Sequence, residues 1–101
     1  MADYKSIRTM VSYSEGGVTS KVISKGDNNQ LTLFCMAEKT DISEHTSTKE
    51  GFVYVIEGSG MFNLEGEEIS MKPGILIRMC RDAKHSIKAI ENTSFLLFLS
   101  E

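Results

Sequence analysis

The chain has 101 residues, enough for one domain and too few for two. Hydrophobic residues make up 41% of it and charged residues 25%, values near globular averages that exclude a disordered or collagen-like chain. The net charge of −3, without a clustered basic field, argues against nucleic acid as a partner. The sequence therefore predicts a single folded domain over residues 1–101.

The sequence also predicts a cytoplasmic protein without a membrane segment. No apolar run approaches the roughly 20 residues that span a bilayer, and the first ten residues lack the apolar core of a secretory signal. Cys35 and Cys80 both lie in apolar stretches, which is typical of buried, reduced thiols in a cytosolic protein. A disulfide between them is the less favoured alternative.

Turn-forming residues recur at intervals of roughly 8 to 12 residues, a spacing typical of an all-β sandwich or barrel. Between the turns lie short segments rich in Val, Ile, Phe, Tyr, Leu and Thr, and no segment keeps a helical period for three turns. The pattern predicts strands over residues 18–24, 30–37, 52–57, 60–65, 68–72, 75–79, 86–90 and 94–99.

Residues 52–56 and 95–99 are apolar on both faces, unlike the other segments. A strand of this kind is covered on both sides, so these two are expected to be central. The core would cover one side, and an apolar cavity or a partner subunit the other. Two turns are also expected, a tight hairpin at Glu65-Gly66 and a type II turn at Pro73-Gly74.

Residues 44–58 and 71–87 resemble the two motifs of the cupin superfamily, whose members are small jelly-roll barrels. The resemblance implies an all-β, cupin-type double-stranded β-helix (jelly-roll barrel). It also implies a homodimer, because small cupins commonly pair. The matching residues are His45 and Gly58 in the first motif, and Gly74 and His85 in the second.

In cupins with the full motifs, two histidines of the first motif, a carboxylate and the histidine of the second motif bind one divalent metal. His45 and His85, the only histidines of this chain, fall on these metal positions, while Ser47 and Gly51 replace the second histidine and the glutamate. The resemblance therefore implies either a transition metal (Fe, Mn, Ni, Zn or Cu) or no metal, since a histidine pair needs a third protein group to bind well.

Glu50 is the candidate third metal ligand. It lies one residue before the family's glutamate, so in a regular strand its side chain would point away from the site. A bulge at residues 47–49 would turn it inward and complete a triad with His45 and His85, as in non-haem iron oxygenases. The alternative is a solvated Glu50 at the cavity mouth.

Four further residues are candidates for a ligand pocket. Arg81 could attract an anionic molecule such as a carboxylate, or it could belong to a solvated edge. Cys80 could reach the cavity or be a small buried hydrophobe, and Ser47 could hydrogen-bond the histidines. For Tyr54, a place in the core or in a dimer interface is favoured over contact with a ligand.

Three functions remain open from the sequence. The first is a metal-dependent oxygenase or isomerase that acts on a small polar or aromatic molecule, with His45 and His85 as ligands and Glu50 as third ligand or general base. The second is a metal-free or weakly metal-binding module for a small organic ligand. The third is an accessory protein that functions through its dimer surface. The sequence does not decide whether the protein is an enzyme.

Overall fold

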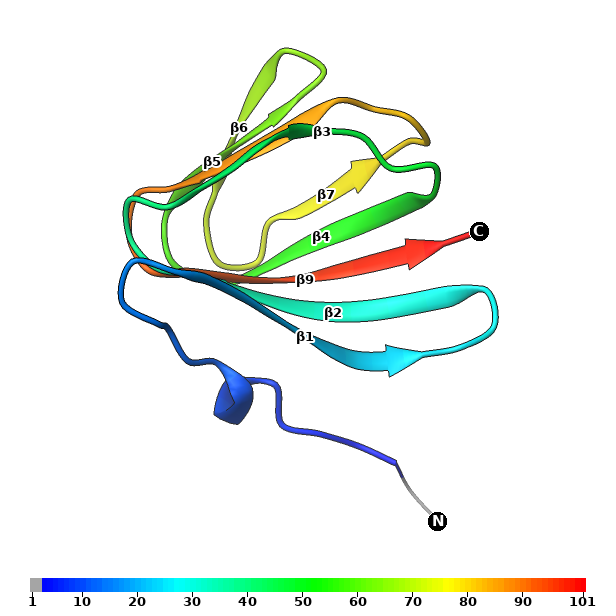
Figure 1. Cartoon of the computed structure of the whole chain (residues 1–101), viewed down its shortest axis with the longest axis horizontal. Coiled ribbons are helices and arrows are strands. Elements are labelled where there is room, and N and C mark those ends of the chain that lie inside the picture. Colours follow the sequence, from blue (N-terminus) through cyan, green and yellow to red (C-terminus); the bar gives the residue numbers. More distant parts are fainter. Residues whose placement is uncertain (1–2) are drawn as a thin grey trace.

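The computed structural model describes residues 3–101, so Met1 and Ala2 of the expected domain lie outside the described residues. The described part contains one short 3-10 helix, η1 (Arg8–Met10), and nine strands (Figure 1). The strands are β1 (Val18–Lys25), β2 (Asn29–Met36), β3 (Asp41–His45), β4 (Glu50–Glu57), β5 (Gly60–Leu64), β6 (Glu67–Met71), β7 (Leu76–Met79), β8 (His85–Ala89) and β9 (Thr93–Ser100).

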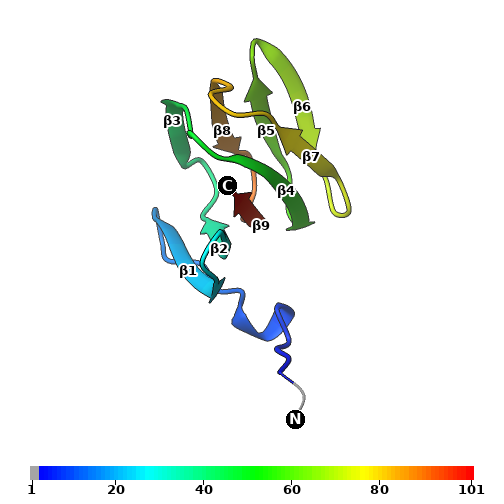
Figure 2. The same ribbon diagram turned by 90° about the vertical axis from the view of Figure 1, so that its right-hand side faces the viewer.

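The strands form two antiparallel sheets that face one another, with the orders β1-β2-β9-β4-β7 and β3-β8-β5-β6 (Figure 2). The pairs β2·β9, β3·β8, β4·β7 and β5·β6 are nested, as in one long hairpin rolled up on itself. This nesting is the arrangement of a jelly roll, so the predicted all-β, cupin-type fold is confirmed. The strands predicted to be central, β4 and β9, are interior to the five-stranded sheet.

Both predicted turns are present. Glu65 and Gly66 have φ angles of 49° and 86°, the positive pair that a two-residue hairpin needs between β5 and β6. Gly74 has a φ of 90°, and the amide of Ile75 donates to the carbonyl of Lys72 at 3.0 Å, which closes the second turn. These turns bring β6 back against β5 and direct the chain into β7.

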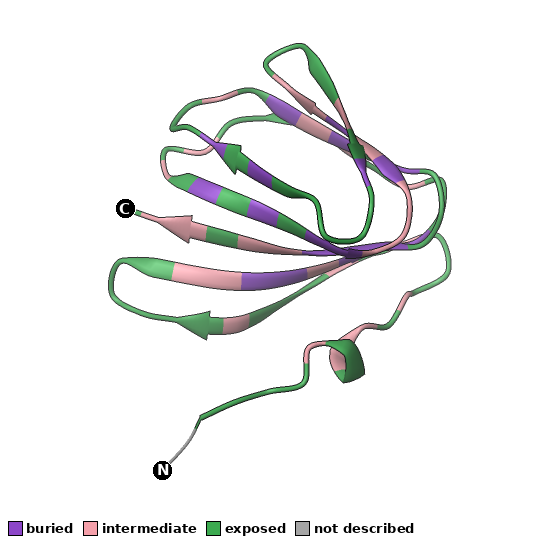
Figure 3. Ribbon diagram, turned by 180° about the vertical axis from the view of Figure 1, so that it is seen from behind, coloured by how far each residue is buried: buried purple, intermediate pink, exposed green. Residues whose placement is uncertain are grey.

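The main core lies between the two sheets, where buried residues alternate along the strands with exposed ones (Figure 3). Val53 and Val55 of β4 point inward while Phe52 and Tyr54 point outward, as the two-residue period of a strand requires. The side chains that are most completely buried here include Phe62, Phe95, Met36 and Met71.

A second apolar cluster lies on the outer face of the five-stranded sheet, under residues 7–13, which we call the N-terminal strap. Leu33, Cys35 and Ile56 are buried there against Ile7, Met10, Val11 and Tyr13 of the strap. The hydroxyl of Tyr13 donates to a carboxylate oxygen of Glu57 at 2.9 Å. Burial, with Glu57 nearby, raises the pKa of Tyr13 to about 12, so this hydroxyl remains a donor.

The structure differs from the sequence predictions in two elements. Strand β3 was not predicted, because its only apolar residue is Ile42 and its other side chains are exposed at the edge of the four-stranded sheet. The short helix η1 was not predicted either. In the described part of the chain, no helix has the length and apolarity needed to cross a membrane.

Both cysteines are free in the structure. Cys35 is buried under the strap, but Cys80 is exposed, and here the prediction of a buried hydrophobe is wrong. The reason is strand parity, because Met79 immediately before Cys80 points into the core.

Candidate functional site

A cavity of about 60 Å³ lies between the two sheets. Among the described residues that line it, the only polar side chains are the imidazoles of His45 and His85, and the rest are aliphatic, aromatic or thioether. This volume holds a few water molecules or a small ligand, and it is well below the roughly 300 Å³ or more of pockets for drug-sized molecules. The apolar wall consists of Phe34, Ile42, Val53, Phe62, Met79, Ile87, Phe95 and Leu97.

Two paired strands bring the histidines together. His45 is the last residue of β3, His85 is the first of β8, and the two are directly opposite one another. Ile42 is opposite Ile87, so three steps along β3 correspond to two along β8. This extra residue is a bulge, and it turns both Ile42 and His45 toward the cavity, whereas a regular strand would point them to opposite faces.

Each imidazole is held by a backbone carbonyl two residues before it. Nδ1 of His45 lies 2.8 Å from the carbonyl oxygen of Ser43, and Nδ1 of His85 lies 3.1 Å from that of Ala83. A neutral imidazole with its proton on Nδ1 donates to the carbonyl and keeps a lone pair on Nε2. Within residues 3–101, neither Nε2 has a hydrogen-bond partner.

His85 is buried between two rings. Its ring is parallel to that of Phe62 at a centroid distance of 5.9 Å, and the ring of His45 meets it at 4.0 Å with an interplanar angle of 62°. Burial lowers the pKa of His85 below its ordinary value of 6.5, the hydrogen bond to Ala83 opposes this, and the neighbouring His45 lowers the pKa further. His85 is therefore neutral at pH 7, the form that binds metals.

The structure does not bring Glu50 to the histidines. Glu50 is exposed, on the same face of β4 as Phe52, which is the outer face of the five-stranded sheet. The bulge occurs in β3 and not at residues 47–49, so it does not change the direction of Glu50. The inward position belongs to Gly51, and there a Cβ would lie 2.5 Å from the carbonyl oxygen of Phe98.

The four pocket candidates also lie away from the cavity. Tyr54 is on the outer face of β4, one residue after the inward-facing Val53. Cys80 and Arg81 are exposed in the turn that follows β7. Ser47 is in the loop after β3, where its hydroxyl accepts from the amide of Lys49 at 3.1 Å and not from a histidine. Strand alternation and loop position account for where these four side chains lie.

Sequence reasoning missed the aromatic wall of the site. Phe62 stacks on His85, and Phe34 stacks on Phe95 with a centroid distance of 5.1 Å. The alternation in residues 60–65 was a signal that Phe62 faces inward. Nothing in the sequence indicated that it would be opposite a histidine.

Comparisons with known proteins agree on the fold. A model of the cupin domain family matches residues 32–100. A protein of unknown function from Streptococcus pyogenes is 19% identical and superposes over 100% of this chain and 89% of its own, with a TM-score of 0.89. No curated protein matches the chain.

Two further solved structures are similar in fold. KdgF from a Halomonas species is 19% identical over 88% of this chain and 84% of its own, with a TM-score of 0.80. A mutant salicylate 1,2-dioxygenase from Pseudoaminobacter salicylatoxidans is 14% identical over 89% of this chain and 28% of its own, with a TM-score of 0.77. At these identities the likeness concerns the fold.

Proposed function

The chain belongs to the cupin family, and from this premise we propose that its cavity binds a divalent transition metal through His45 and His85, together with a small ligand. The observation that carries the proposal is the state of the two imidazoles. Each has its Nδ1 on a backbone carbonyl and an Nε2 with no hydrogen-bond partner among residues 3–101, which is how metal-binding histidines are usually oriented.

His45 and His85 could supply two of the ligands of a metal ion. Residues 3–101 contain no cluster of three His, Cys, Asp or Glu side chains that could hold a metal ion. The remaining coordination positions would go to water or to the ligand, and the affinity would be modest. A metal bound here would polarise an oxygen atom of the ligand as a Lewis acid.

The cavity wall limits what the ligand can be. The wall is apolar except for the two imidazoles, and the volume of about 60 Å³ admits a molecule of a few heavy atoms, while the exposed side of His45 gives solvent access to the cavity. Among residues 3–101, the cavity has no side chain that could act as a general acid or base besides the two imidazoles, which a metal would occupy. Binding is therefore the function that the geometry supports best.

The second candidate is a metal-free cavity in which the two imidazoles hydrogen-bond a small organic molecule. The observation that favours it is the outward direction of Glu50, which leaves the pair without a third ligand. A cytoplasmic location, which the sequence predicts, belongs to the proposal in either form.

Metal content by mass spectrometry tests the proposal. Wild-type protein, His45→Ala and His85→Ala would each be exposed to Fe, Mn, Ni, Zn and Cu in turn and then freed of excess metal. We expect metal in the wild type and its loss in both variants. Glu50→Gln is the matched control and should keep the metal, because that side chain lies on the outer face.

Two results would contradict the metal proposal. Metal that persists in both histidine variants would place the site elsewhere. A wild type that takes up none of the five metals would leave the metal-free candidate. Small carboxylates would then be titrated by NMR, with shifts expected at His85 and Phe62, which line the cavity.

A further inference from the structure

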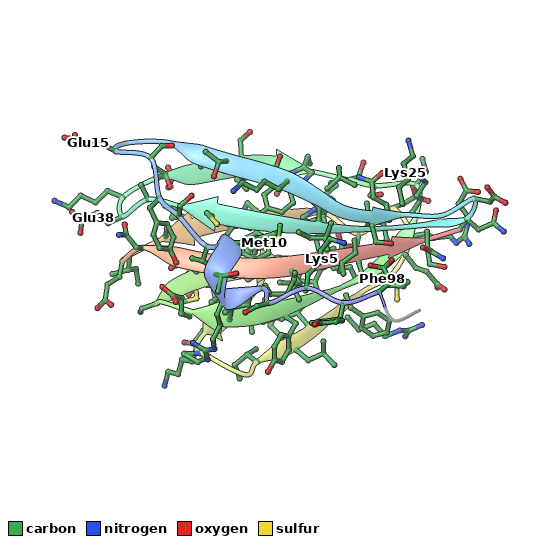
Figure 4. All side chains as sticks on the ribbon, turned by 90° about the horizontal axis from the view of Figure 1, so that it is seen from below. Lys5, Met10, Glu15, Lys25, Glu38 and Phe98 are labelled. Atoms are coloured by element: carbon green, nitrogen blue, oxygen red, sulfur yellow. The ribbon has the colours of Figure 1, made fainter. Side chains whose placement is uncertain are left out.

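A thiol and a hydroxyl group lie side by side under the N-terminal strap. Figure 4 shows the strap, marked by Met10, lying across the outer face of the five-stranded sheet. Beneath it, Cys35 of β2 is directly opposite Ser94 of β9, so the two side chains are on the same face. Cys35 is 3% exposed and Ser94 is fully buried. The pair is separate from the cavity of His45 and His85, which lies on the inner side of this sheet.

The hydroxyl of Ser94 has no hydrogen-bond partner within residues 3–101. Its neighbour Tyr13 donates to Glu57 at 2.9 Å. Burial raises the pKa of Tyr13 and the nearby Ser94 hydroxyl opposes this rise, but the two hydroxyls do not meet the geometry of a hydrogen bond. A buried hydroxyl without a partner destabilises the folded state, and native proteins contain few of them. Ser94 can therefore still donate to a group that is added next to it.

An oxygen atom bonded to the sulfur of Cys35 would be such a group. The Cβ atoms of directly opposite residues in an antiparallel pair lie about 4.5–5.5 Å apart. Sγ of Cys35 and Oγ of Ser94 are each one bond from Cβ, and no hydrogen bond joins them. One oxygen on Sγ would shorten this gap and accept the hydrogen of the Ser94 hydroxyl. A sulfenic acid, in which the sulfur carries a single OH group, is the product that places one oxygen there.

The strap controls access to the sulfur. Within residues 3–101, two hydrogen bonds join the strap to the sheet. One is the bond from Tyr13 to Glu57, and in the other the ammonium of Lys21 donates to the carbonyl of Met10 at 3.5 Å. A short segment with so few polar contacts opens locally, without unfolding of the domain. Opening exposes Cys35 to solvent, where its thiolate can form and react, and closing covers the product.

We propose that hydrogen peroxide modifies Cys35 to a sulfenic acid, which Ser94 holds by a hydrogen bond beneath the closed strap. The thiolate sulfur attacks one oxygen of the peroxide, and an S–O bond forms as the O–O bond breaks. The sulfur loses two electrons and the peroxide gains them. The second oxygen leaves as hydroxide, which takes the proton released by the thiol and becomes water. The modification is independent of any metal at His45 and His85, because the two sites lie on opposite faces of the sheet.

Trapping with dimedone, a cyclic diketone that reacts with sulfenic acids, tests the proposal. The parent protein is Cys80→Ser, which changes an exposed side chain and keeps Cys35 as the only cysteine. It would be treated with hydrogen peroxide, unfolded and trapped, and the adduct located by peptide mass spectrometry. We expect the adduct on Cys35, and its loss when dithiothreitol is added before the trap. Peroxide also oxidises methionine, but a sulfoxide does not react with dimedone.

Ser94→Ala in the same parent tests the hydrogen bond. Under continued peroxide its sulfenic acid should pass to the sulfinic acid roughly fivefold faster, the factor that one neutral hydrogen bond is worth. Ser100→Ala is the matched control, because it removes a hydroxyl from the same face of β9 at the far end of the strand, and it should behave like the parent. The Ser94 hydroxyl has no partner to lose in the reduced protein, so this variant should fold, which circular dichroism checks.

Tyr13→Phe in the same parent tests the strap, since it removes one of the two hydrogen bonds that hold it. The sulfenic acid should form several times faster in this variant. Three outcomes would overturn the proposal. One is a parent protein that gives no dimedone adduct at Cys35. Another is a sulfenic acid that lasts as long in Ser94→Ala as in Ser100→Ala. The third is a sulfenic acid that forms no faster in Tyr13→Phe than in the parent.

Discussion

Removing one hydroxyl group from the N-terminal strap tests how the strap is held. The hydroxyl of Tyr13 donates to Glu57 at 2.9 Å, and the strap covers Cys35, which is 3% exposed. A hydrogen bond to a charged group contributes about 1.5–3 kcal/mol net. Glu57 is only half-buried and water can replace the lost donor, so we expect Tyr13→Phe to cost about 1 kcal/mol. Strap opening should then rise about fivefold.

The two free cysteines make this opening measurable. An aromatic disulfide reagent should label the exposed Cys80 at once and Cys35 slowly, through opening of the strap. In Tyr13→Phe we expect the labelling rate of Cys35 to rise about fivefold, the factor that corresponds to about 1 kcal/mol, while that of Cys80 stays constant. Glu57→Gln keeps a hydrogen-bond acceptor and should have a smaller effect.

The urea dependence of labelling separates strap opening from global unfolding. Opening of a short segment exposes little surface, so the rate for Cys35 should depend only weakly on urea. An unchanged Cys35 rate in Tyr13→Phe would refute the role of the hydroxyl. A urea dependence as steep as that of global unfolding would refute independent opening of the strap.

Two further predictions concern stability. Because burial lowers the pKa of His85 from 6.5, the unfolded chain binds this proton more readily. The free energy of unfolding should therefore be highest above pH 6.5 and should fall as the pH drops toward the lowered folded-state pKa. Urea titrations at several pH values should show this dependence. An equally strong pH dependence in His85→Gln would contradict it. In Gly51→Ala, a Cβ 2.5 Å from the carbonyl oxygen of Phe98 should cost about 1–3 kcal/mol. Calorimetry should show that Tm falls by about 4–8 °C for each kcal/mol lost. Gly17→Ala is the control, because its new Cβ would lie 3.4 Å from the Cβ of Ser14, an ordinary contact, and this variant should have a higher Tm than Gly51→Ala.

The candidate site was only partly predictable. His45 and His85 could be selected from the sequence because they are the only histidines and match the positions of two short motifs. Their orientation could not be predicted, since it depends on the bulge between Ile42 and His45. That bulge lies in a strand that the hydrophobic pattern does not indicate, because an edge strand with one apolar residue has no clear alternation.

The sequence by itself determined the period-two segments, the two central strands and the turns at Glu65-Gly66 and Pro73-Gly74. These features depend on local properties, namely which side chains are apolar and which residues accept a positive φ. Only the tertiary structure decided which way Glu50, Tyr54 and Cys80 point. Side chains on a strand alternate between two faces, so one inserted residue reverses the face, and only the pairing of β4 with β7 and β9 fixed the face on which Glu50 and Tyr54 lie.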